Sequence, residues 1–266
     1  MQKSILAIAT LVVGLMAVEG PAQAVVSFNQ NVTNEAIFGS GNSNGGWTVD
    51  RTDGIELGLR AKVRFPVPLN TFNSNGNGTY NHAAGNSSGQ ALWNFEWSIN
   101  TDYNNTTGLD LNDLAYRLRL DYRATTGLNF LDFDPINVAL ADHSIGDNTT
   151  AQGAGVEAAD AGTYATLINA NNLAQNSWRL NFFAGPEAFN PNATGQYTFV
   201  LEAYRRDGRL ASSTQMDVCV TPGAVSNDCT PALVPEPASL AVLMLGLAGL
   251  GWTIQRRRPS EASQQA

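Results

Sequence analysis

The chain has 266 residues and is poor in charge, with 15 Lys and Arg residues against 23 Asp and Glu residues and a net charge of −8. An acidic chain offers no broad basic face to phosphates, so this balance argues against nucleic-acid binding. A hydrophobic content of 43% suffices for a folded domain with a sizeable core, which argues against a disordered chain.

Residues 1–24 have the pattern of a secretory signal peptide. Lys3 supplies a basic start, residues 5–18 form an apolar core, and Ala22-Gln23-Ala24 is a small-x-small cleavage site. We therefore predict export, with cleavage after Ala24.

Alternation of apolar and polar residues predicts a mainly β body. Residues 55–65 carry apolar side chains at every second position and mostly charged ones between them, as in a strand with one solvated face. The same period of two recurs in 93–99, 114–122, 178–182, 197–203 and 216–220, and shorter apolar pieces occupy 128–133 and 136–140. Asp207-Gly208 predicts a tight hairpin.

The segments between these strands are rich in turn residues. Residues 70–90 predict a long polar loop, and residues 158–173 contain the one weak helix. Seven or more strands without a convincing crossover helix predict an antiparallel β-sandwich, of jelly-roll-like topology, over residues 25–233.

The chain contains two cysteines, Cys219 and Cys229. In an oxidising compartment such a closely spaced pair predicts a disulfide that fastens the last strand to the end of the domain. Metal or redox chemistry would need a closer pair or histidine partners.

The C-terminal end has three parts in a fixed order. Val234-Pro235-Glu236-Pro237 is followed by an uncharged apolar run to Ile254, about long enough to span a membrane, and then by Arg256-Arg257-Arg258. Basic residues beside a span stay on the cytoplasmic side, so we predict a single C-terminal transmembrane helix with the bulk of the chain outside the cytoplasm.

This order and spacing resemble the PEP-CTERM sorting signal of Gram-negative bacteria, over residues 234–258. The resemblance implies transit to the cell envelope, transient anchoring in the inner membrane, removal of the tail by an exosortase, and release or attachment at the surface. Residues 259–266 form a short tail that the usual signal lacks. An ordinary C-terminal membrane anchor is the alternative.

The predicted strands add a second, weaker resemblance. Residues 54–65, 178–182 and 195–220 are similar to the β-sandwich ectodomain found in many PEP-CTERM proteins. That resemblance implies a fold and brings no activity with it.

No catalytic motif stands out. Residues 41–45 fit G-x-S-x-G, and residues 153–158 fit G-x-G-x-x-A, but neither has the strand and helix that its chemistry requires. His82 and His143 lie in predicted loops far apart in sequence and are expected at the surface. We therefore expect no enzyme and no cofactor.

Two weaker binding hypotheses remain. Asp110, Asp132 and Asp134 could supply oxygen ligands to Ca²⁺, although aspartates at such positions also make turns. Trp47 lies in a Gly-rich loop and could contact a saccharide, whereas three other tryptophans share the parity of aliphatic core residues: Trp93, Trp97 and Trp178.

The sequence as a whole predicts an exported surface or extracellular-matrix protein with a structural or adhesive role. Its predicted partners are the exosortase, the export machinery, the membrane before processing and, if it joins a biofilm, exopolysaccharide. A carbohydrate-binding module and a polysaccharide-active enzyme are the alternatives.

Overall fold

The computed structural model describes residues 26–223 except 34, 39–41, 67, 69, 124–126, 138–141 and 184–188. The predicted signal peptide, the predicted transmembrane segment and the sorting signal lie outside these residues. Within the described part of the chain, no helix has the length and apolarity needed to cross a membrane.

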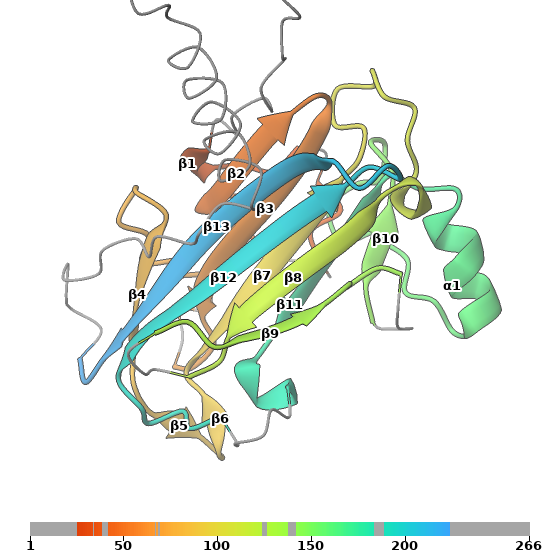
Figure 1. Ribbon diagram of the computed structural model, residues 1–266. Coiled ribbons are helices and arrows are strands. Elements are labelled where there is room, and N and C mark those ends of the chain that lie inside the picture. Colours follow the sequence, from red (N-terminus) through yellow and green to blue (C-terminus); the bar gives the residue numbers. More distant parts are fainter. Residues whose placement is uncertain are drawn as a thin grey trace, which may run out of the picture. The chain divides into compact units, whose positions relative to one another are not determined.

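The first sheet is antiparallel and has six strands in the order β1-β2-β3-β7-β11-β10 (Figure 1). Its strands are β1 (Ser27–Gln30), β2 (Trp47–Thr52), β3 (Ile55–Val63), β7 (Trp93–Asn100), β10 (Ser144–Gly146) and β11 (Leu173–Trp178). The long central strands β3 and β7 pair along eight residues, from Glu56 opposite Asn100 to Val63 opposite Trp93.

The second sheet has five strands in the order β4-β13-β12-β8-β9. They are β4 (Thr79–Ala83), β8 (Ala115–Asp121), β9 (Phe130–Phe133), β12 (Gly195–Tyr204) and β13 (Leu210–Thr221). All neighbours are antiparallel except β4, which runs parallel to β13. A small hairpin joins β5 (Asn86–Ser87) to β6 (Gln90–Ala91).

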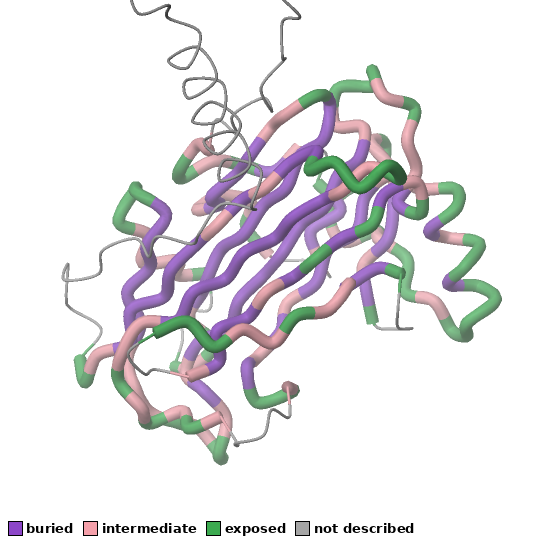
Figure 2. Tube along the Cα trace, viewed as in Figure 1, coloured by how far each residue is buried: buried purple, intermediate pink, exposed green. Residues whose placement is uncertain are grey.

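One apolar core lies between the two sheets. Alternate residues of a strand face one side, so Leu57, Leu59 and Ala61 on β3 point to the core together with Trp97 on β7. The second sheet contributes Leu118 and other fully buried residues to the same cluster. Buried stretches run along the central strands of both sheets in Figure 2. The prediction of a mainly β body with antiparallel sheets is confirmed, and the jelly-roll topology stays a prediction.

Several predicted elements differ from the structure. The predicted loop at 70–90 contains β4, whose residues Tyr80 and His82 alternate toward the core and pair with β13. The Asn and Gly residues around β4 dominate the local pattern and predict a loop. The segment is a strand because it pairs with β13, which lies far along the chain. The predicted strand at 178–182 is wrong, because β11 ends at Trp178 and a 3-10 helix (Leu180–Phe182) follows.

The helix α1 (Ala161–Ile168) is shorter than the predicted segment 158–173. It begins after Asp160, whose side chain accepts a hydrogen bond from the Thr163 N–H at 2.8 Å. The chain leaves the helix at Asn169 and enters β11 at Leu173. Leu173, the last residue of the predicted helical segment, therefore belongs to β11, because β11 pairs with β7.

The outer face of the first sheet is covered, contrary to the expectation of a solvated face on β3. Residues 31–33, 35–38 and 42–46, here called the N-terminal segment, lie over this face and contribute Val32 and Ile37 to a second apolar cluster with Trp47 and Val49. The charged residues of β3 that point to this side are buried, with exposures of 0% for Glu56 and Arg60 and 5% for Lys62. Alternation cannot reveal this cover, since it depends on a distant segment.

Candidate functional site

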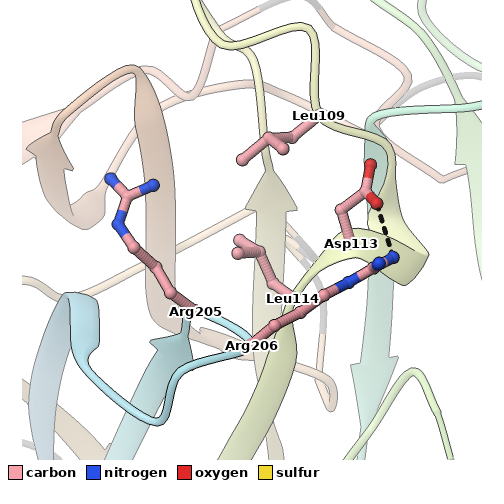
Figure 3. A pocket seen from close by; sticks show the side chains of 5 residues that line it. All are labelled: Leu109, Asp113, Leu114, Arg205 and Arg206. Atoms are coloured by element: carbon pink, nitrogen blue, oxygen red, sulfur yellow. Dashed lines mark hydrogen bonds and ion pairs between the residues drawn. The ribbon is translucent and has the colours of Figure 1, made fainter.

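A surface pocket of about 300 Å³ lies beside the turn between β12 and β13 (Figure 3). It is lined by Leu109, Asp113, Leu114, Arg205 and Arg206. The two leucine side chains lie between the two arginines, which diverge from neighbouring positions on the turn. Leu114 is buried, and its neighbour Asp113 ends a 3-10 helix (Leu111–Asp113).

Both guanidinium groups of the pocket have carboxylate partners. Arg206 Nη2 lies 2.8 Å from Asp113 Oδ1, and Arg205 Nη2 lies 3.3 Å from Asp53 Oδ2. Among the five lining residues there is no nucleophile beside a general base, which covalent catalysis requires.

The two histidines are buried, which corrects the expectation that both lie at the surface. His82 on β4 is 1% exposed and stacks on Trp93 with ring centroids 5.9 Å apart. Its Nε2 has no hydrogen-bond partner in the described structure, and burial lowers the pKa of His82 to about 3. A neutral imidazole in an apolar site is a core residue rather than a base poised near neutral pH.

His143 is held by hydrogen bonds in the core. Its Nε2 donates to the Pro135 carbonyl at 2.7 Å, and its Nδ1 accepts from Asn176 Nδ2 at 2.9 Å. Burial lowers the pKa of His143, against smaller opposite effects of Pro135 and Asp142. Within the described residues, neither histidine is hydrogen-bonded to a serine hydroxyl or a carboxylate, so the geometry of a Ser-His-Asp triad is not assembled there.

The three aspartates considered for Ca²⁺ have other partners. Asp132 pairs with Arg117 and lies 3.5 Å from Arg119 Nε. Asp134 accepts hydrogen bonds from the backbone N–H groups of Tyr116, Ile136 and Asn137.

Asp110 precedes the 3-10 helix, and its N–H donates to Asp113 Oδ2 at 3.0 Å. No group of three or more His, Cys, Asp and Glu side chains suited to a metal occurs among the described residues. The contacts of Asp110 and Asp134 are those of turn-forming aspartates, and Asp132 is paired with arginine. Calcium binding at these residues stays a hypothesis.

Trp47 is not exposed, which corrects its assignment as a saccharide contact. It begins β2, is fully buried, and has the Arg60 guanidinium 4.2 Å from its ring centroid. The Gly-rich sequence before it suggested a loop, but the N-terminal segment folds over the ring. The core positions of Trp93, Trp97 and Trp178 are as predicted.

A buried cluster of charged residues lies beneath the N-terminal segment. Glu96 on β7 is fully buried, with its Oε2 2.5 Å from Arg60 Nε and its Oε1 2.5 Å from Lys62 Nζ. Burial raises the pKa of Glu96, and the charges of Arg60 and Lys62 lower it by more, so the net direction is downward. The carboxylate is thus held ionised although it is fully buried.

The same cluster binds the N-terminal segment directly. Arg60 Nη1 donates to the carbonyls of Ser43 and Gly45 at 2.9 and 2.7 Å, and Lys62 Nζ donates to Asn42 Oδ1 at 2.9 Å. Sequence reasoning missed this group because Arg60 and Lys62 alternate with apolar residues and resemble a solvated face. The sequence feature that could have indicated the cluster is Glu96, a single carboxylate in a strand rich in aromatic residues.

The structure describes one of the two cysteines of the predicted disulfide. Cys219 lies on β13 and is 6% exposed, whereas Cys229 lies outside the described residues. The disulfide between them stays a prediction. The cleavage residues Ala22 and Ala24 and the sorting residues Val234 to Pro237 and Arg256 to Arg258 also lie outside the described part.

The described residues form a mainly β domain of two stacked sheets. The comparison with family models identifies the C-terminal tail. Residues 233–258 match the family model of the PEP-CTERM protein-sorting motif. The chain therefore carries a PEP-CTERM sorting motif, which implies export and processing by an exosortase. Searches of curated proteins and of solved structures found no match.

Proposed function

We propose that this chain is a surface or extracellular-matrix protein with a non-catalytic, structural or adhesive role, delivered by export and exosortase processing. The match at residues 233–258 carries the proposal, because a sorting motif implies a destination outside the cytoplasm. The predicted signal peptide at residues 1–24 agrees with it.

The described body supports a structural rather than a catalytic role. Its large exposed apolar side chains are scattered over different elements instead of forming an aromatic row: Phe28, Leu128, Val156, Phe182 and Leu210. The pocket of Figure 3 has one carboxylate, which is paired with Arg206. A glycosidase would need two carboxylates facing a sugar.

Tail processing can be tested with a matched pair of variants in a host that contains an exosortase. In Glu236→Ala the carboxylate of the Pro-Glu-Pro segment is lost, whereas Glu261→Ala removes a carboxylate beyond the arginine cluster. We expect Glu236→Ala to accumulate in the membrane with its C-terminal arginines intact, and Glu261→Ala to be processed like the wild type. Intact mass and C-terminal peptide mass distinguish the forms.

Two outcomes would contradict the proposal. A wild-type protein that keeps its full C-terminus in the membrane would be an ordinary anchored protein. Equal processing of both variants would show that the Pro-Glu-Pro segment is not read. If neither outcome is observed, recovery of the shortened protein from the cell surface or the medium supports the surface or matrix role.

A further inference from the structure

Three side chains from distant parts of the chain meet beneath the N-terminal segment. They are the Lys62 amine on β3, the Glu96 carboxylate on β7 and the Asn42 carboxamide. Lys62 Nζ lies 2.9 Å from Asn42 Oδ1 and 2.5 Å from Glu96 Oε1. An amine, an amide carbonyl and a carboxylate are thus in mutual reach at a site where Lys62 is 5% and Glu96 0% exposed.

We propose that Lys62 and Asn42 join in an intramolecular isopeptide bond, and that Glu96 is the catalytic acid and base. The product is an amide between Lys62 Nζ and Asn42 Cγ, and it crosslinks the N-terminal segment to the first sheet. Neither the sorting motif nor the proposed surface role is needed for this reaction.

The reaction balances without any added reagent. Glu96 takes a proton from the Lys62 ammonium, and the free amine attacks Asn42 Cγ to form the new C–N bond. The C–N bond to Nδ2 then breaks as Glu96 returns its proton to that nitrogen. Glu96 takes the second proton from the new amide nitrogen and passes it to the departing ammonia, which leaves as ammonium. The carboxylate is regenerated, and nothing is oxidised or reduced.

The geometry is close to that of an attack. A carbonyl bond is about 1.2 Å long, so the 2.9 Å contact with Oδ1 places Asn42 Cγ within about 4.1 Å of Lys62 Nζ. Reacting atoms in near-attack arrangements are about 3–3.5 Å apart. A shift of under about one ångström would therefore bring the two atoms together.

The neighbours hold the reacting groups in place. Asn42 Nδ2 donates to the Phe38 carbonyl at 3.0 Å, which orients the carboxamide. Arg60 acts as a positioning residue at both sides of the reaction, since it binds Glu96 Oε2 and the carbonyls of Ser43 and Gly45 next to Asn42. Burial excludes water, which strengthens the electrostatic effect of each group on the proton transfers.

Such a bond would serve a protein that works outside the cell. The N-terminal segment covers buried charges and Trp47, and its loss would expose them to solvent. A covalent link across this segment prevents it from peeling off the sheet. Like a disulfide it restricts the unfolded chain, but it cannot be reduced.

The first test is the mass of the purified protein, made in a host without an exosortase so that tail processing does not enter. We expect the intact mass to be lower by one ammonia than the mass calculated for the observed termini. Trypsin does not cleave at an acylated lysine, so the digest should contain the peptide ending at Arg51 joined to Ala61-Lys62-Val63-Arg64. Full mass, together with cleavage after Lys62, would overturn the proposal.

Three variants assign the roles. Lys62→Arg retains the positive charge beside Glu96 but has no primary amine, and Asn42→Ala removes the acceptor from a half-buried position, so both should keep the full mass. Glu96→Gln retains the shape and loses the base, so it too should keep the full mass. If folded Glu96→Gln, checked by circular dichroism, forms the bond as fast as the wild type, Glu96 is not the catalyst.

Discussion

Replacement of Arg60 by methionine tests the buried charge cluster most directly. The variant leaves the Glu96 carboxylate buried without the guanidinium partner of its Oε2 and removes the donor of two hydrogen bonds to the carbonyls of Ser43 and Gly45. Removal of one partner from a buried ion pair costs about 3–5 kcal/mol, because the remaining charge stays desolvated. The lost contact with Trp47 adds about 1 kcal/mol or more, since the guanidinium is fully buried against the ring.

The same substitution at Arg117 is a matched control. Arg117 also lies on a strand and pairs with Asp132, but its side chain is 46% exposed, and exposed pairs contribute about 0–1 kcal/mol. Urea unfolding measures the difference. With a slope of about 2 kcal/mol per molar, Arg60→Met should lower the midpoint by about 2–3 M and Arg117→Met by less than about 0.5 M. Midpoints that agree within about 0.5 M would refute the reasoning.

Two further predictions concern packing and pH. Gly58→Ala should destabilise the protein by about 1–3 kcal/mol, because the added methyl carbon would lie 2.8 Å from Val32 Cγ1; adding Val32→Ala should recover part of this loss, and a double-mutant cycle without coupling would contradict the close approach. His82 is depressed to a pKa of about 3 from an ordinary 6.5, so its contribution to stability is complete above pH 6.5 and is lost at about 1.4 kcal/mol per pH unit as the pH falls toward 3. His82→Phe should lack this component in unfolding experiments between pH 7 and 4, and parallel profiles of the two proteins would show that His82 is not buried as a neutral ring.

The central strands could be predicted from the sequence because their signal is local. Apolar residues at every second position of β3, β7 and β12 place one face against the core whatever the partner strand is. The hairpin at Asp207-Gly208 was predictable for the same reason, since Gly208 adopts a φ of 81° that glycine tolerates without strain. The tail was recognisable from the order of its three parts.

The misses have a common cause in contacts between distant residues. β4 lies among asparagines and glycines and becomes a strand by parallel pairing with β13, which is more than 100 residues away. Trp47 follows a Gly-rich stretch that folds over it instead of leaving it in solvent. His82 and His143 sit in locally polar sequence and are drawn into the core by their partners.

The sequence by itself determined the export pattern, the sorting tail and the β periodicity, since each depends on residues that are neighbours along the chain. Only the tertiary structure decided whether the outer face of the first sheet is solvated. The N-terminal segment covers that face, and the approach of Asn42 to Lys62 and Glu96 brings together groups separated by up to 54 positions in the sequence. The ion pairs between β3 and β7 and the contact of Asn42 with Lys62 cannot be predicted from alternation. The burial of a strand's outer face depends on the segment that lies over it and not on the strand alone.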